Sequence, residues 1–480
     1  MSTAEIIQLL IISVIATGGS IFLVIGVAGG VHVEPYIRRQ ASALLPALLL
    51  FGFAASTLIS GRNASLYGLV GNILEDSGSG RGVWILRIAT AMAVGISSLV
   101  VVSAFLRKPD EKNPARPLFF AFSIYFVFSY VVSGIFGTEP TISHKTFYPF
   151  LIMFGLYLTS DQGEELLLRL VRDGLLVMLI TGLCLIPVAP DLVLQRGYVG
   201  FIPGFSYRYW GLASHANNIG PLSIFFFLIL CWLPYRSRAM VMFAIAVAGI
   251  TLIISQSKTS LVSATLIAGI FMVRWWWQAV FSNKFGRGVS AAVISLSMLA
   301  VLVVLVAFVA DMYSQPMEKL LNKIQGRGTI LTGREFIWKI TVAEWERSPI
   351  FGYGPALWGD EFSARFGYLG IASNAHNQFF DTLGSAGIVG ATSLIVYAAA
   401  LVFYAVRLAD PSNWLSIALI VFVLTRCISE VPLKTMNITT SDFFMHAVVI
   451  GLFMRSAWLL KQNCVPANQA NTPARSPNQQ

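Results

Sequence analysis

Apolar stretches long enough to cross a lipid bilayer recur along nearly the whole chain, and they limit the fold more than any other feature. A helix needs roughly 17–25 mostly apolar residues to span the hydrocarbon core of a membrane. Charged residues make up only 12% of the 480 residues, about half of the usual fraction in soluble proteins. An outer-membrane barrel would instead show alternating segments of about 10 residues. We therefore expect an all-α polytopic membrane protein with about 12–14 transmembrane helices.

The apolar runs place the expected spans as follows: 6–31, 41–59, 83–106, 117–136, 146–159, 166–188, 217–233, 239–255, 260–280, 288–310, 387–406, 414–431 and 441–460. The span 146–159 is short, and a re-entrant helix is the alternative for it. The first run lacks a basic start and a small-residue cleavage site, so we expect a retained helix rather than a signal peptide.

One polar interval, residues 311–386, is much longer than the other connections. Within it, Thr332 and Glu335 have the spacing of a capping box, which predicts a helix ending near Arg347. Ile337, Ile340 and Trp345 are expected among the buried residues of this helix.

A second start signal at Ser373 predicts a short helix over 376–383, on which His376, Phe380 and Leu383 share one face. Gly384 and Gly387 are expected to end this helix before the next span. The chain is thus expected to have four parts. These are residues 1–310 with about ten transmembrane helices, the loop 311–386 with short helices, the C-terminal transmembrane helices of 387–460, and a disordered tail at 461–480.

The orientation of the chain follows from its Lys and Arg residues. Of the two sets of alternate short loops, one is clearly richer in these residues, and that side is expected to be cytoplasmic. The tail then lies in the cytoplasm, and the loop 311–386 lies outside the inner membrane, in the periplasm of a Gram-negative cell. The same loop asymmetry explains the net charge of +10, so no nucleic acid partner is expected.

The outer side gathers several cations and histidines. Arg196, Arg208 and His215 lie among aromatic residues in the loop 189–216, and Lys258 lies in a tight turn between two spans. The arginines of this loop suit phosphate binding, because a guanidinium group can donate two parallel hydrogen bonds to phosphate oxygens. The alternative is that the loop forms a belt of Trp, Tyr and Arg at the membrane interface.

The polar interval adds Arg334 and His376. Histidine is the side chain best suited to accept a hydroxyl proton near neutral pH, although a lone histidine is more often structural. Several cations and one base suit a phosphorylated substrate presented from the membrane. Inside the membrane, Arg426 and Glu430 are one helical turn apart and are expected to be able to pair, in either a functional or a structural role.

Other chemistries lack their motifs. The four cysteines have no metal-ligand spacing, and no cluster of His, Cys and Asp suggests a metal site. A P-loop and a Gly-x-Ser-x-Gly elbow are also missing. We expect no metal and no cofactor.

Several short motifs resemble, in their order, the O-antigen ligase/polymerase family of bacterial polysaccharide assembly. These motifs are Arg208-x-x-Gly211, His215-Ala216-Asn217, Ser257-Lys258-Thr259, Leu331-Thr332-Gly333-Arg334-x-x-x-Trp338, Pro349-Ile350-Phe351-Gly352-Tyr353-Gly354 and His376-Asn377-x-x-x-Asp381-x-Leu383-x-x-x-Gly387-x-x-Gly390. The resemblance covers roughly residues 190–405. The chain departs from the family at Lys258, where arginine is more common, and at Ala216, where proline is usual.

The resemblance implies a GT-C-like membrane glycosyltransferase that needs neither a metal nor a nucleotide sugar. Such enzymes pass a glycan from undecaprenyl pyrophosphate to an acceptor hydroxyl on the outer face of the inner membrane, with inversion. By analogy, His376 positions or deprotonates the acceptor. By the same analogy, Arg208 and Lys258 hold the pyrophosphate. The full set of residues that we expect to bind substrate is Arg196, Arg208, His215, Asn217, Lys258, Arg334 and Asn377.

The acceptor separates two readings within the family. A polymerase of O-antigen or exopolysaccharide adds the chain to a lipid-linked repeat unit, and a ligase adds it to lipid A core. The motif around His376 favours the polymerase, which would have membrane lipids and a chain-length regulator as further partners. A polysaccharide or lipid flippase is the alternative from another class, but the chain shows no internal repeat and no matched pair of broken helices.

Overall fold

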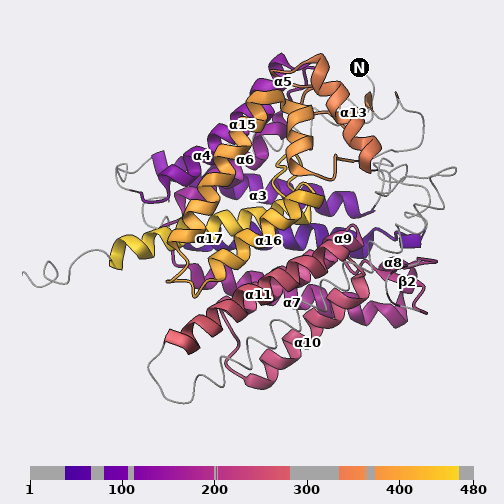
Figure 1. Cartoon of the computed structure of the whole chain (residues 1–480), viewed down its shortest axis with the longest axis vertical. Coiled ribbons are helices and arrows are strands. Elements are labelled where there is room, and N and C mark those ends of the chain that lie inside the picture. The colour runs from indigo at the N-terminus through magenta and orange to yellow at the C-terminus, as the bar shows by residue number, and fades with distance from the viewer. Residues whose placement is uncertain are drawn as a thin grey trace, which may run out of the picture.

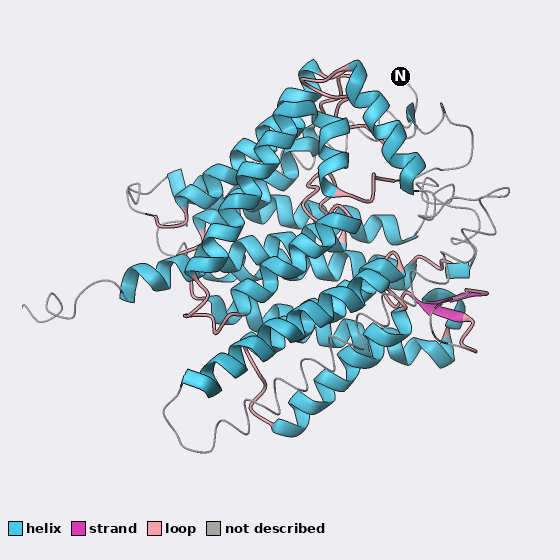
Figure 2. Cartoon of the chain, in the orientation of Figure 1, coloured by secondary structure: helices cyan, strands magenta, loops and turns pink. Residues whose placement is uncertain are grey.

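The computed structural model describes residues 38–65, 81–105, 113–198, 200, 202, 204–281, 334–359, 361–362, 365 and 373–463. These residues form a bundle of helices (Figures 1 and 2). Its main helical elements are Arg38–Ile59, α3 (Arg81–Phe105), α4 (Arg116–Phe126), the π-helical segment η2 (Val127–Val132), α5 (Ser133–Phe136), the 3₁₀ turn η3 (His144–Phe147), α6 (Tyr148–Leu158), α7 (Glu164–Val188), α8 (Pro190–Val193), α9 (Ala216–Trp232), α10 (Arg238–Ser255), α11 (Lys258–Phe281), α13 (Arg334–Arg347), α15 (Gln378–Arg407), α16 (Leu415–Ser429) and α17 (Ser441–Asn463).

The expected all-α membrane fold is confirmed. Seven helices among the described residues are long and apolar enough to cross a membrane, and α9 and α16 are shorter apolar helices that lie where spans were expected. The expected spans 6–31 and 288–310 lie outside the described residues, so the total of about 12–14 spans stays a prediction.

A small hairpin is the exception to the helical pattern. Strands β1 (Leu194–Arg196) and β2 (Tyr207–Tyr209) pair antiparallel, with Gln195 opposite Arg208 and Arg196 opposite Tyr207. This hairpin gives the aromatic loop 189–216 a defined structure that the sequence did not predict. It lies at the same end of α9, α10 and α11 as α13 (Figure 1).

The short segment around α6 runs back along α4 from one end of the bundle toward the other. Aromatic contacts join α4 and the segment around α6, which run antiparallel. Phe126 contacts Phe147 at one end of this row, and Phe119 contacts Tyr157 at the other. The chain then leaves at the opposite end, where the Arg38 guanidinium bonds the carbonyl of Leu158. A helix of 11 residues suffices because the 3₁₀ turn and the residues before it cover the rest of the distance.

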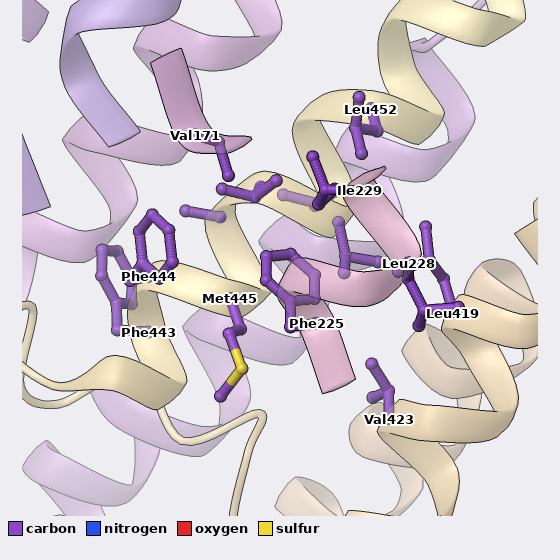
Figure 3. Packing of buried hydrophobic residues seen from close by; sticks show 14 of the residues in the cluster. Val171, Phe225, Leu228, Ile229, Leu419, Val423, Phe443, Phe444, Met445 and Leu452 are labelled. Carbon is purple, nitrogen blue, oxygen red and sulfur yellow. The ribbon is translucent and has the colours of Figure 1, made fainter. Parts of the chain in front are cut away.

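The core of the bundle surrounds α17. Phe444 of α17 packs against Phe225 of α9, and Phe443 and Met445 belong to the same buried cluster, together with Val423 of α16 (Figure 3). Buried side chains occur on all faces of α17, which is the pattern of a helix enclosed by other helices rather than one at the lipid boundary. This central helix fixes the relative positions of α9 and α16, whose ends carry the polar residues described below.

Loops that were expected on the same side of the membrane do lie at the same end of the bundle. At one end, Arg38 pairs with Asp161 at 2.6 Å and Arg274 donates to Asn413 at 2.7 Å. At the other end, Arg62 donates to the carbonyls of Leu192, Gly211 and Ala213. Each contact joins loops that the alternation of spans assigns to one side. Which end faces the cytoplasm stays a prediction.

The polar interval contains the expected helix α13, and its buried residues include Ile337 and Ile340, as predicted. Trp345 is only half-buried, because its indole N–H reaches the exposed carbonyl of Pro349. The capping residue Thr332 and the side chain of Glu335 lie outside the described residues. We call α13 together with residues 378–386 of α15 the helical pair.

A sharp bend at Gly387 separates the helical pair from the long apolar part of α15. Its φ of 63° is in the left-handed region, and a Cβ there would collide with the carbonyl of Ile350. The turn after α13 is hydrogen-bonded to this bend through Ile388 N–H to Pro349 and Gly354 N–H to Ser385. The predicted break near Gly387 is therefore confirmed, and it fixes the helical pair to a membrane helix.

The predicted start of the second short helix is wrong. Helix α15 begins at Gln378, and Asn377 rather than Ser373 caps it by accepting hydrogen bonds from the N–H groups of Phe379 and Phe380. His376 therefore lies outside the helix and does not share a helical face with Phe380.

Candidate functional site

A buried carboxylate, Glu430, is the centre of a polar cluster at one end of the bundle. Glu430 is the first residue after α16, and its side chain is 12% exposed. Its Oε2 lies 3.1 Å from His376 Nδ1. Its Oε1 accepts a hydrogen bond from Asn217 Nδ2 at 3.1 Å and lies 3.7 Å from Arg334 Nη2. Four segments that are distant in sequence therefore meet at one side chain.

The backbone at His376 has an unusual conformation. Its φ is 48°, a left-handed value that is uncommon for a residue with a side chain. The Asn374 side chain accepts the His376 N–H at 2.8 Å, and Asn377 Nδ2 donates to the carbonyl of Ile428 in α16 at 3.1 Å. The first contact closes the turn on itself, and the second holds the turn against the end of α16. They aim the imidazole at Glu430, and strain of this kind occurs often at functional sites.

A second set of contacts ties the same turn to the loop after Glu430. Asp381, buried in the first turn of α15, accepts the N–H of Ala375 at 3.0 Å and pairs with Lys434 at 3.1 Å. Gln378 accepts the N–H of Leu433 at 2.8 Å. His376 and Glu430 are thus both held by their chain neighbours, so the separation of their side chains does not depend on their own contact alone.

Arg208 connects the hairpin to this cluster. Its Nη2 donates to Asn217 Oδ1 at 2.5 Å, and its Nε donates to the carbonyl of Ser255 at 3.3 Å. The guanidinium also lies 4.7 Å from the centre of the Tyr198 ring. Asn217 therefore relays between the Arg208 cation and the Glu430 carboxylate. Burial lowers the pKa of Arg208 from its ordinary value.

His215 has a structural place beside this relay. It precedes α9, and its Nδ1 accepts the N–H of Asn217 at 3.1 Å, as an N-cap does. Its ring lies 4.6 Å from the Trp210 ring. Burial, and then the charge of Arg208, lowers the pKa of His215 to about 4. The ring is therefore neutral at pH 7, as it must be for its Nδ1 to accept a hydrogen bond.

The charge state of Glu430 follows from its partners. Burial raises the pKa of the Glu430 carboxyl, but the hydrogen bond and charge of His376, with the charges of Arg426 and Arg334, outweigh burial and lower it. Glu430 is an anion at neutral pH. When the His376 ring is neutral, an anion there favours the tautomer with the proton on Nδ1, and in that tautomer Nε2 has a lone pair able to accept a proton.

Two of the expected site residues lie apart from Glu430. Arg196 and Arg208 project from opposite faces of the hairpin, because the pleat alternates and Arg208 is paired with Gln195. Arg196 forms an exposed ion pair with Asp191 at 2.8 Å instead. Lys258 follows the Ser255 turn, is exposed, and has no partner among the described residues.

The expected pairing of Arg426 with Glu430 is wrong. Arg426 is buried and pairs with Asp442 at the start of α17, at 2.6 Å. Glu430 leaves the helical geometry at the end of α16, with φ −148°, so the one-turn spacing no longer brings the two side chains together. This frees Glu430 for the cluster.

Two functional candidates were not predicted from the sequence. Glu430 was noted only as a partner of Arg426, although an acidic residue at the end of an apolar span is itself a signal. Arg62 was counted only as a loop charge. Its three hydrogen bonds to backbone carbonyls hold the loop that carries Arg208 and His215.

The chemistry of the cluster does not suggest a metal centre. Among the described residues, no group of three His, Cys, Asp or Glu side chains could hold a metal ion. An apolar groove of about 620 Å³ lies between α9, α10 and α11, and its lining includes none of the expected site residues. The cluster at Glu430 is therefore the candidate site.

Comparison with known families gives a match over about a third of the chain. Residues 242–395 match the family model described as O-antigen ligase, and no curated protein matches the chain. The matched range contains Lys258, Arg334 and His376, whereas Arg208, Asn217 and Glu430 lie outside it. The match confirms the resemblance to the O-antigen ligase/polymerase family and indicates an enzyme of the glycosyltransferase type that acts on lipid-linked glycans.

Proposed function

We propose that this chain, which carries an O-antigen ligase region, moves a glycan from undecaprenyl pyrophosphate to an acceptor hydroxyl on the outer face of the inner membrane. The reaction we favour is the polymerisation of O-antigen or exopolysaccharide repeat units, because of the motif around His376. The single observation that carries the proposal is the contact between His376 Nδ1 and Glu430 Oε2, with Arg208 and Arg334 in the same cluster.

In this mechanism His376 is the general base. Its Nε2 accepts the proton of the acceptor hydroxyl while the hydroxyl oxygen attacks the anomeric carbon. The bond from that carbon to the pyrophosphate oxygen breaks, the electron pair leaves with the pyrophosphate, and the configuration inverts. Glu430 stabilises the imidazolium that forms. A positioned base of this kind contributes about 10²–10⁴-fold to rate.

The cations act on the leaving group. Arg208 and Arg334 place positive charge beside the base, and the exposed Lys258 adds a third cation on the neighbouring turn. Charge stabilisation of a departing pyrophosphate needs cations that are already in place. Arg208 meets this requirement because its contacts with Asn217 and Ser255 fix the position of its guanidinium group. Glu430 offsets part of this charge and keeps the guanidinium groups oriented.

The position of the cluster also bears on the flippase alternative. Glu430, Asn217 and His376 lie at helix termini at one end of the bundle, whereas a transporter binds its substrate near the middle of the membrane. A one-sided site fits a transferase that receives a lipid-linked substrate at the membrane surface.

The test is transfer by the purified protein in lipid nanodiscs, with a lipid-linked oligosaccharide as donor. We expect His376→Asn to abolish transfer, because asparagine tolerates the left-handed backbone but cannot accept the proton. The exposed His144 supplies the matched control, and His144→Ala should retain activity. Normal product length from a folded His376→Asn protein would overturn the proposal. A ladder of products identifies a polymerase, and a single addition to lipid A core identifies a ligase.

A further inference from the structure

An open groove of about 460 Å³ lies on the helical pair, beside the candidate site. It is lined by Trp338, Lys339, Val342, Ala343, Glu346 and Phe380. The five residues from α13 follow helical spacing and form one stripe along it. This stripe is not the core face of α13, which Ile337 and Ile340 supply. Its volume is within the usual range for ligand sites, about 300–1,000 Å³.

Two aromatic rings in the groove are fixed in place. Trp338 and Phe380 stack with ring centres 5.2 Å apart and an interplanar angle of 25°. The Trp338 indole N–H donates to the carbonyl of Ala375 at 2.9 Å. The groove therefore presents a rigid aromatic surface whose orientation is set by the residue directly before His376.

The groove also presents opposite charges without partners. Lys339 and Glu346 are exposed, and neither has an ion-pair partner among the described residues. They are seven positions apart on α13, about 10 Å along the axis, which is too far for a direct pair. By contrast, Glu344 and Arg347 of the same helix pair with each other at 2.6 Å.

These features together select a class of ligand. A saccharide has apolar C–H faces that pack on aromatic rings and hydroxyls that both donate and accept hydrogen bonds. A phosphate would be repelled by Glu346, and a lipid tail would gain nothing from either charge. We propose that this groove is a saccharide subsite that binds sugar rings of the donor or acceptor glycan beyond the reacting bond. The proposal rests on the proposed function for its substrate.

Kinetics on glycans of different length test the subsite. The variants are Ala343→Trp, which fills the groove, and Lys339→Ala with Glu346→Ala, which removes its charges. We expect KM to rise about tenfold for substrates with long glycans, and much less for substrates with a single sugar. One arm varies glycan length on the donor and the other varies it on the acceptor, so the arm that responds identifies the bound glycan. Lys145→Ala is the control, because Lys145 is exposed and outside the groove.

A binding experiment separates this proposal from the proposed function. The probe is a mixture of oligosaccharides released from the surface polysaccharide of the host cell, and saturation-transfer NMR detects its contact with the protein in nanodiscs. We expect a signal with the wild type and its loss with Ala343→Trp. If the wild type binds the oligosaccharides but shows no transfer activity, and Ala343→Trp does not bind them, the result would support the subsite and reject the transferase. Equal binding by both proteins, or a KM change independent of glycan length, would overturn the subsite alone.

Discussion

His376 Nδ1 lies 3.1 Å from Glu430 Oε2, although the two residues are 54 positions apart in the sequence. One residue lies in a strained turn before α15, and the other follows the end of α16. Because each is anchored through its neighbours, the pair is formed before any substrate arrives. Such an arrangement fixes both the ring orientation and the tautomer of a general base.

The first prediction concerns Glu430. Glu430→Gln should lower kcat by about 10²–10⁴-fold, because the amide no longer stabilises an imidazolium or favours the proton on Nδ1. KM for the lipid-linked donor should change little by comparison. Glu361 is an exposed acid of the polar interval, and Glu361→Gln serves as the control. An unchanged kcat in a folded Glu430→Gln protein would contradict the orienting role.

The second prediction uses the two arginines of the hairpin. Arg208→Lys should lower kcat/KM for the donor by about 10–10²-fold, because an ammonium group cannot keep both the Asn217 and the Ser255 contacts. Arg196→Lys should leave kcat/KM unchanged, since Arg196 projects from the other face toward Asp191. Equal losses in both variants would indicate a general interfacial role for the hairpin cations.

The third prediction concerns stability and pH. The pKa of His215 is about 4 in the folded protein and about 6.5 in an unfolded chain. The unfolded state therefore binds more protons between these values, and stability is lost as pH falls from about 6.5 toward 4. His215→Asn keeps a side-chain acceptor for the N–H of Asn217 but does not titrate.

The measurement for this third prediction is the Tm in nanodiscs at several pH values. Between pH 6.5 and 4.5, about two pH units, the Tm of the wild type should fall more than that of His215→Asn. Parallel curves for the two proteins would show that His215 is not held neutral by its surroundings.

The fourth prediction concerns metal ions. Since positive charge at the site is supplied by Arg208 and Arg334, treatment with EDTA should leave the transfer rate unchanged. The assay compares initial rates before chelation, after chelation and after addition of Mg²⁺ or Mn²⁺. Loss of activity that a metal restores would count against a reaction driven by protein cations.

Local pattern in the sequence predicted most of the fold. Apolar runs gave the spans, and helix α13 follows from its predicted capping signal and its buried Ile337 and Ile340. A break near Gly387 was also predicted, because its glycines favour a helix end, and the structure shows the bend there, where a Cβ would clash with the carbonyl of Ile350. The β1–β2 hairpin was missed, since three-residue strands leave almost no periodic signal.

For the candidate site, the sequence by itself determined the residue types: a histidine, several cations and a set of motifs that resemble the family whose model matches residues 242–395. Only the tertiary structure decided which of them meet. It replaced Arg426 with Asn217, Arg334 and His376 as the neighbours of Glu430, and it separated Arg196 from Arg208. The reason is physical. Membrane insertion and helix formation depend on local hydrophobicity, whereas the meeting of helix ends depends on how α9, α15, α16 and α17 pack, and no single segment encodes that packing.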